Sequence, residues 1–336
     1  MALQKNQENL KHKLRMNKYN QILVGEYHMA KRLFILGNGF DLDHKLETSY
    51  GNFENWVFNK NKELHSKISF MMEEHSNIAL SDEDKLKWSD FERSFHEIIQ
   101  GDWGQNFIEG SIQEYLSDSG DPNFSDSDWG SLVYELEEQL VSLAEVKTLF
   151  KEWIPSIVEP TIKQHSPKYV FNKEDLFFSF NYTTTLETIY KIEESNIYHV
   201  HGDYQNVIVG HNGTFVDNFS EEYDPENDNT MLSEAIDSIS ILHADLSKDV
   251  DKQIDKLKES IFLSELKSVN KIYVLGHGYG EYDYPYYKII SKEVTNECVW
   301  NFYPHEPKDK KNLCKLLKKL PNIKYQIFDS IPEVFD

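Results

Sequence analysis

Residues 32–50, RLFILGNGFDLDHKLETSY, begin with a short apolar run that stops at Gly37, Asn38 and Gly39. An apolar run of this length that ends in glycine predicts a buried strand followed by a tight turn. The turn is either structural or part of a loop in which backbone touches a ligand, because glycine permits close approach. A helix that begins there would favour a phosphate. The dinucleotide fingerprint is incomplete, since Leu42 stands where its third glycine would fall.

Further segments with a strand-like apolar pattern follow along the chain. They are residues 175–180, 197–202, 206–210, 271–276, 298–303 and 323–328. Helical sequence lies between most of them, and strands that alternate with helices predict a parallel sheet covered on both faces. The expected fold class is therefore α/β, with a Rossmann-like, mostly parallel sheet and a large helical insertion.

The chain divides into an arm and one domain on sequence grounds. Residues 1–30 are predicted to be a polar, basic N-terminal arm and residues 31–330 the α/β domain. Within that domain we expect a helical insertion over 52–166, and an acidic loop followed by helices over 217–267. Two capping-box pairs, Ser89 with Glu92 and Thr184 with Glu187, predict the starts of two helices.

Composition narrows the class of protein. The 336 residues include 57 acidic and 35 basic side chains, a formal net charge of −22. Such a surface repels phosphate backbones, so nucleic acid is an unlikely partner unless a basic patch is segregated. The two cysteines exclude a four-cysteine zinc module and a disulfide framework, and they fit a reducing cytoplasm. No apolar run is long enough to span a bilayer. We therefore expect a cytoplasmic protein without a membrane partner.

Polar residues and glycines collect where four of the predicted strands end. They are Gly37, Asn38, Gly39 and Asp41 after the first strand, Asn181 after 175–180, His201 after a second histidine (His199) in 197–202, and Gly276, His277, Gly278, Gly280 and Asp283 after 271–276. In a doubly wound sheet, ligands bind outside the carboxyl ends of the strands. Each feature alone is more often a turn, a cap or a core histidine. Their coincidence at four strand ends indicates a common site.

The order of these motifs resembles a known family. LFILGNGFDLDHKLETSY, WSDFE, FSFNYTTTLE, IYHVHG and VLGHGYGEYDYPYY are similar to the bacteriophage abortive-infection AbiH family, over about residues 32–330. The same order resembles the wider sirtuin-like group, whose members bind NAD in a Rossmann-like fold. The prokaryotic defence members of that group hydrolyse NAD to starve phage-infected cells.

The resemblance implies roles for particular residues. Asn181 would position the attacking water, and His201 would be the catalytic histidine. The residues assigned to NAD binding are Gly37, Asn38, Gly39, Phe40, Asp41, Ser49, Tyr50, Gly276, His277, Gly278 and Asp283. No metal is expected, and the candidate partners are NAD or a related nucleotide, a phage-derived trigger and further copies of the chain.

Three departures from the sirtuin pattern are visible. Thr183 stands where sirtuins carry an aspartate two residues after the asparagine, the four-cysteine zinc ribbon is absent, and Asn38 and Asp41 stand where sirtuins have small residues. The second departure argues against protein deacylation.

The residues also suit this chemistry without the family. Cleavage of a nicotinamide–ribose bond passes through a cationic sugar, so what helps is a positioned water and a base that is neutral near pH 7. A histidine meets the second need with its ordinary pKa of about 6.5. An asparagine amide holds water because it donates and accepts at once.

Three other functions remain open at the level of sequence. A metal-dependent hydrolase could use His199, His201, His211 and His277 with Asp41 or Asp283. A nuclease toxin would fit the abortive-infection resemblance, although the net charge opposes it. A nucleotide-binding sensor without turnover would use the aromatics of GEYDYPYY for base stacking or for an interface.

Overall fold

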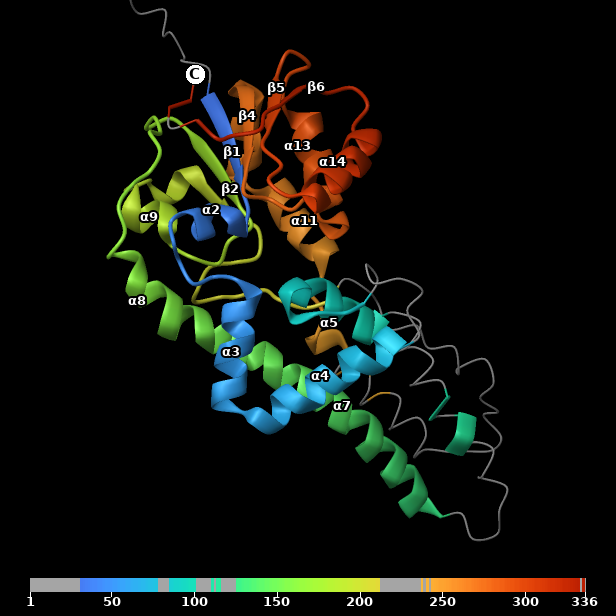
Figure 1. Cartoon of the computed structure of the whole chain (residues 1–336). Coiled ribbons are helices and arrows are strands. Elements are labelled where there is room, and N and C mark those ends of the chain that lie inside the picture. Colours follow the sequence, from blue (N-terminus) through green and yellow to red (C-terminus); the bar gives the residue numbers. More distant parts are fainter. Residues whose placement is uncertain are drawn as a thin grey trace, which may run out of the picture.

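The chain folds around one parallel sheet (Figure 1). The computed structural model describes residues 31–77, 85–100, 110–111, 113–115, 125–211, 237, 240–241, 243–332 and 334–335. Its strands are β1 (Lys31–Leu36), β2 (Leu176–Ser179), β3 (Ile197–His199), β4 (Val269–Leu275), β5 (Val299–Phe302) and β6 (Lys324–Ile327). All neighbouring strands pair in parallel, in the order β3-β2-β1-β4-β5-β6. This is the doubly wound dinucleotide-binding order, and its direction reverses between β1 and β4.

Helices cover the sheet and extend beyond the carboxyl ends of its strands (Figure 1). They are α2 (Asn38–Asp43), α3 (Tyr50–Lys60), α4 (Lys62–Asn77), α5 (Phe91–Gln100), α7 (Asp126–Trp153), α8 (Glu159–Ile162), α9 (Thr185–Ile189), α11 (Val250–Glu259), α12 (Ile261–Glu265), α13 (Tyr284–Glu293) and α14 (Pro307–Lys319). Helices α11 to α14 cover one face, where Leu33, Ile272 and Trp300 lie in their core. On the other face, Phe34 and Tyr273 pack against aromatic side chains from α2, the 169–171 segment and the C-terminus. The predicted α/β, Rossmann-like class is confirmed.

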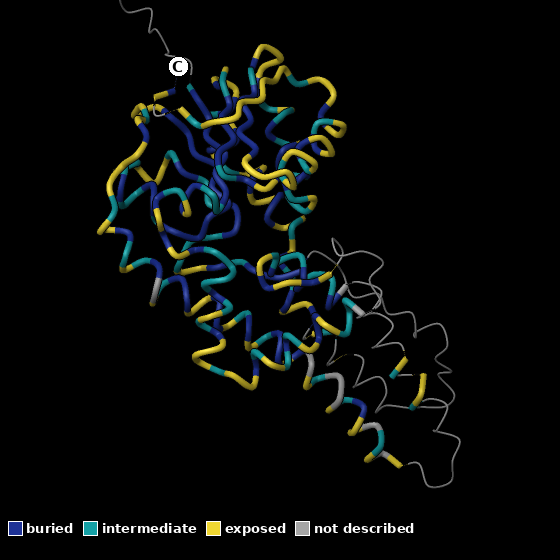
Figure 2. The backbone as a smooth tube through the Cα atoms, in the orientation of Figure 1, coloured by how far each residue is buried: buried dark blue, intermediate teal, exposed yellow. Residues whose placement is uncertain are grey.

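A helical layer lies below the carboxyl ends of the strands, and α3, α4, α5 and α7 form it (Figure 1). It has its own apolar core, centred on rings such as Phe53, Phe150 and Trp153. Tyr182, from the loop after β2, belongs to the same core and meets the Phe150 ring edge-on at 5.3 Å. Figure 2 shows buried backbone running from the sheet into this layer. The helical layer thus covers the carboxyl ends of the strands and shields the polar groups there from water.

One predicted strand does not form, and two predicted helices begin about where expected but without the capping boxes that suggested them. Residues 206–210 form no strand; Val207 and Val209 are buried in the helical core, and only an isolated bridge from His211 to Ser247 follows. Neither capping box forms, because α5 begins after the 3-10 turn Trp88–Asp90 and the Thr184 side chain does not cap α9. In both pairs the glutamate is engaged by a tertiary partner instead, as the site shows.

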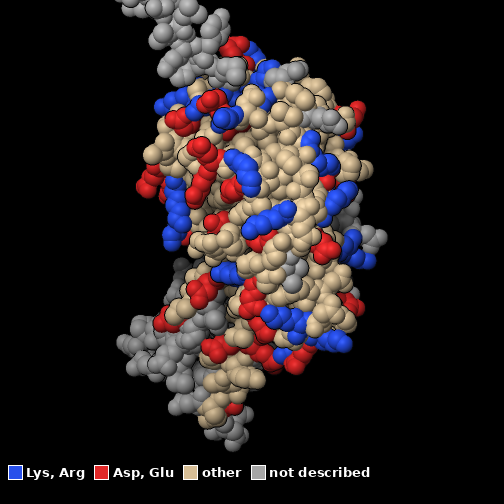
Figure 3. Space-filling view, turned by 90° about the vertical axis from the view of Figure 1, so that its left-hand side faces the viewer, with Lys and Arg blue, Asp and Glu red and all other residues tan. Residues whose placement is uncertain are grey.

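Other predictions fall on parts of the chain outside the described residues. The arm over 1–30 lies there, as does most of the acidic loop within 217–267. Among the described helices, none is both long and apolar enough to cross a membrane. On the face seen in Figure 3, Lys and Arg side chains lie interspersed with Asp and Glu.

Candidate functional site

The predicted site residues converge at the carboxyl edge of β2, β3 and β4. Asn181 follows β2, His201 follows β3, and His277 and Asp283 follow β4. The Phe180 ring lies between the two histidines, 5.5 Å from His201 and 4.5 Å from His277 by ring centroids. Residues far apart in the sequence therefore form one cluster beside the point where the strand order reverses.

Asn181 is buried, and its amide lies near the Asp41 carboxylate. The residue is only 6% exposed, and neither Oδ1 nor Nδ2 lies at hydrogen-bond distance from a protein group, although the amide is close enough to lower the pKa of Asp41. The main chain is fixed, since its N–H donates to Ser179 Oγ at 3.2 Å and its carbonyl lies 3.2 Å from His199 Nδ1. The backbone thus holds in place an amide that can still form hydrogen bonds with a ligand.

His201 presents one free ring nitrogen. It is 4% exposed, its Nδ1 has no partner, and its Nε2 lies 3.8 Å from Asp283 Oδ1. The next residue, Gly202, has a φ of +73°, and a Cβ there would lie 1.9 Å from the Asn206 carbonyl oxygen. Only glycine fits that turn, so the turn fixes where His201 points. The Tyr182 ring stacks on the imidazole at 6.2 Å.

Asp283 joins the two histidines. Its Oδ2 lies 3.3 Å from His277 Nε2, while its Oδ1 faces His201. Burial alone would raise the pKa of Asp283, but contacts to His201 and His277 hold that pKa below its usual range. The carboxylate therefore stays ionised between the rings.

An ion pair missed at the sequence level flanks His201. Glu92 on α5 accepts from Lys248 Nζ at 2.8 Å and from the Tyr182 hydroxyl at 2.9 Å. Burial, and then the charge of Lys248, lower the pKa of His201, whereas Asp283 and Glu92 oppose that shift. The sequence suggested Glu92 only as one member of a capping box. No sequence pattern indicated Lys248, which lies just before α11.

The glycines of the first and last motifs touch each other. The N–H of Gly37 donates to the Leu275 carbonyl at 3.0 Å, and that of Gly39 donates to the Gly276 carbonyl at 2.8 Å. A Cβ on Gly37 or Gly39 would lie 2.7 Å from backbone atoms of the β4 loop. The close approach of β1 and β4 explains these glycines without a ligand. Their assignment to a diphosphate stays a prediction.

Asp41 is buried rather than exposed to a ligand. Its two carboxylate oxygens accept from the Thr183 and Thr185 hydroxyls, at 2.6 and 2.7 Å. Thr183 stands at the position that the resemblance matches to a sirtuin aspartate. Its hydroxyl donates to Asp41, which belongs to the first motif. Burial raises the pKa of Asp41 to about 6, although both hydroxyls and the nearby Asn181 amide lower it.

The raised pKa of Asp41 predicts an unusual pH dependence of stability. A folded chain that holds a proton more tightly than the unfolded chain loses stability as the pH rises between the two pKa values. We expect the free energy of unfolding to fall by about 3 kcal/mol between about pH 4 and pH 6, relative to Asp41→Asn. Denaturant unfolding across this range measures it, with exposed Asp255→Asn as the control. Parallel curves for wild type and Asp41→Asn would contradict the assignment.

The other predicted cofactor residues lie apart from this cluster or serve the scaffold. Asn38 donates to the Thr48 carbonyl, Phe40 packs in the aromatic core, and Ser49 caps α3. Tyr50 is the exception, because it lies beside Glu92, which flanks His201, and close enough to Asp283 to feel its charge. Gly278 is exposed, and its carbonyl accepts from Asn312. These positions leave their roles in binding as predictions.

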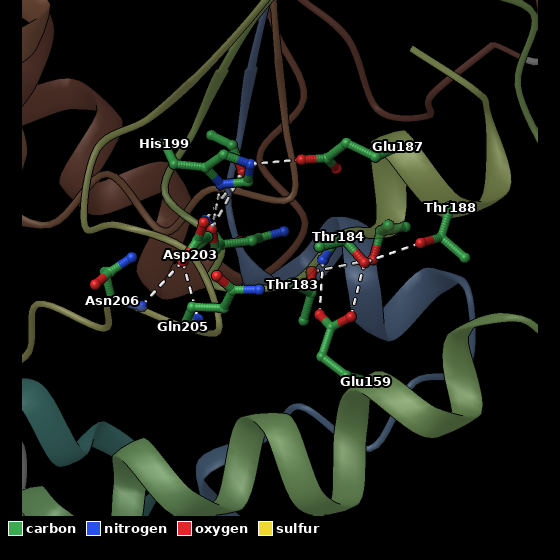
Figure 4. Close-up of polar contacts among 12 residues, drawn as sticks. Glu159, Thr183, Thr184, Glu187, Thr188, His199, Asp203, Gln205 and Asn206 are labelled. Atoms are coloured by element: carbon green, nitrogen blue, oxygen red, sulfur yellow. Dashed lines mark hydrogen bonds and ion pairs between the residues drawn. The ribbon is translucent and has the colours of Figure 1, made fainter. Parts of the chain in front are cut away.

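A second polar network, drawn in Figure 4, includes His199, whose Nδ1 lies 3.2 Å from the Asn181 carbonyl. Glu187 of α9 lies 2.9 Å from His199 Nε2. Glu187, which the sequence suggested as part of a capping box, therefore pairs with a histidine at the end of β3. Glu159 of α8 accepts from the Thr184 N–H and hydroxyl, both at 2.7 Å. These contacts connect the loop that carries Asn181 to the surrounding helices.

No group of three or more His, Cys, Asp or Glu side chains is arranged to hold a metal ion within the part of the chain that the structure describes. The side chains considered for a metal do not all meet. His211 Nε2 donates to the His243 carbonyl at 2.9 Å, and the Asp41 carboxylate accepts from threonine hydroxyls.

Fold and site together define a Rossmann-like α/β protein with buried, unpartnered polar groups at the carboxyl edge of its sheet. Residues 33–303 match the family described as bacteriophage abortive infection AbiH. This match spans more than half of the chain, and the chain therefore belongs to the AbiH family, which indicates a role in abortive infection. Comparisons with curated proteins and with solved structures found no match.

Proposed function

We propose that this chain is an abortive-infection effector that hydrolyses NAD to nicotinamide and ADP-ribose. One observation carries the proposal: the buried amide of Asn181 and the buried Nδ1 of His201 have no protein group at hydrogen-bond distance. A buried polar group without a partner costs about 1–3 kcal/mol, so such groups are usually kept for a ligand or for water. They lie at the carboxyl edge, beside the switch point, where doubly wound sheets bind nucleotides.

The chemistry assigns a step to each side chain. The bond between the ribose C1′ and the nicotinamide nitrogen breaks, and its electron pair leaves with nicotinamide. A water held by the Asn181 amide forms the new bond to C1′ and gives a proton to His201 Nδ1. Burial and Lys248 lower the pKa of His201 below its ordinary value, so this base is neutral at physiological pH.

The two glycine turns support this site indirectly. By bringing the ends of β1 and β4 into backbone contact, they set the separation between Asn181 and the β4 loop that carries His277 and Asp283. The likeness of the motif order to sirtuin-like NAD hydrolases adds to the proposal, and Asn181 and His201 are the matched positions to which it gives catalytic roles.

The test follows nicotinamide and ADP-ribose by chromatography after purified protein is incubated with NAD. Equimolar release of both products is the expected result, and calorimetry should detect NAD binding. In infected cells that express the chain, NAD should fall after phage infection. Binding without release, in the tube and in infected cells, would identify a nucleotide sensor instead. Absence of both binding and release would contradict the assignment of NAD.

A further inference from the structure

His277 is held in one tautomer. Its Nδ1 lies 2.9 Å from the Tyr279 backbone N–H, which can only donate, and 3.1 Å from the Tyr287 hydroxyl. Nδ1 of His277 is therefore an acceptor, and the neutral ring carries its proton on Nε2. That N–H donates to Asp283 Oδ2, at 3.3 Å. The backbone of the β4 loop thus fixes His277, and His277 fixes Asp283.

The remaining carboxylate oxygen of Asp283 faces His201. The separation from Oδ1 to His201 Nε2 is 3.8 Å, which is within ion-pair range and longer than a direct hydrogen bond. Catalytic contacts of this kind are often long without substrate and shorten in the complex. A carboxylate on the Nε2 side favours the tautomer with a proton on Nε2. The lone pair is then on Nδ1, the ring nitrogen that has no protein partner.

We propose that Asp283 and His277 are positioning residues for His201, and that they orient its ring so that Nδ1 meets the substrate water. This inference rests on the proposed function and deepens it. It gives Asp283 and His277 a role different from the contact to the cofactor that the sequence suggested. Asp283 also stabilises the imidazolium that forms when His201 takes the proton, as a buried aspartate does beside a catalytic histidine.

The charged groups near His201 determine the direction in which each substitution shifts its pKa. Asp283, from the turn before α13, and Glu92, from α5, raise the pKa of His201, whereas Lys248, from the segment before α11, lowers it. His277 reaches His201 through Asp283. Removing the charge of Asp283 therefore lowers the pKa of His201, and removing the charge of Lys248 raises it.

The experiment compares wild type with Asp283→Asn and Lys248→Met. Asparagine keeps an oxygen for His277, and methionine keeps much of the lysine stem. We expect Asp283→Asn to reduce kcat/KM for NAD about 100-fold. The acid limb of its pH profile should move to lower pH, because His201 then stays neutral to a lower pH. Lys248→Met should move the same limb to higher pH.

A second readout does not depend on turnover. NMR of ¹³C-labelled histidine, with His201→Gln to assign the signal, gives the pKa of His201 in each protein without NAD. The expected shifts have the same two signs. An unchanged His201 pKa in folded Asp283→Asn would overturn the positioning role, whatever the activity. If the two variants show the expected shifts of the His201 pKa but the wild type neither binds nor hydrolyses NAD, the contact is upheld and the proposed function is refuted.

Discussion

Substitution of Asn181 or His201 by alanine is expected to reduce nicotinamide release by about 10²–10⁴-fold, the usual contribution of a positioned acid–base group. Asn181→Ala removes the amide that holds the water, and His201→Ala removes the base. Because the two act on the same water, the double variant should lose little more activity than either single one. Initial rates at saturating and at low NAD measure the effect.

Control variants separate chemistry from folding. Asn59 and His305 are exposed, so Asn59→Ala and His305→Ala should retain full activity. Asn181→Leu keeps the shape of the side chain but removes two buried polar atoms that lie at hydrogen-bond distance from no protein group, so it should be inactive but still folded. Nicotinamide release that survives in both Asn181→Leu and His201→Ala would refute their assigned roles.

Gly276→Ala is expected to destabilise the fold by about 3 kcal/mol or more, through a strained φ and overpacking. Gly276 has a φ of +61°, and a Cβ there would lie 2.2 Å from the Phe40 backbone nitrogen. That nitrogen belongs to the backbone of the first loop, so relief requires β1 and β4 to separate at their ends. The midpoint of denaturant unfolding and the Tm measure the loss.

The matched control for Gly276 lies in α7. Gly130 is exposed, and a Cβ there would meet nothing within 4 Å. Since glycine costs a helix up to about 1 kcal/mol relative to alanine, Gly130→Ala should be neutral or stabilising. The two substitutions add the same methyl group with opposite expected signs. Equal stability of Gly276→Ala and wild type would contradict the tight contact between the two loops.

The role of these glycines shows where sequence patterns are ambiguous. A glycine turn after a strand is required wherever backbone approaches closely, whether the approaching group is a phosphate or another segment of the chain. In this protein the approaching group is Gly276, at the end of the adjacent strand. Only the pairing of β1 with β4 distinguishes the two cases, and that pairing depends on residues more than 200 positions apart.

The sequence by itself determined the elements and the edge at which the site lies. Short apolar runs with glycine or polar ends predicted six strands that the structure contains, because burial and turn formation are local properties. Parallel strands align their carboxyl ends, so Asn181, His201, His277 and Asp283 could be placed at one edge before any contact was known.

Tertiary structure decided the partners. Glu92 and Glu187 satisfied a local rule for helix caps, yet Glu92 pairs with Lys248 and Glu187 pairs with His199. Val207 and Val209 had a strand pattern, but none of the six described strands pairs with them. A buried carboxylate or imidazole takes its protonation state from whatever the fold places within a few ångströms. The free Nδ1 of His201, the buried amide of Asn181 and the raised pKa of Asp41 are therefore properties of the folded chain, because each depends on burial and on groups distant in sequence.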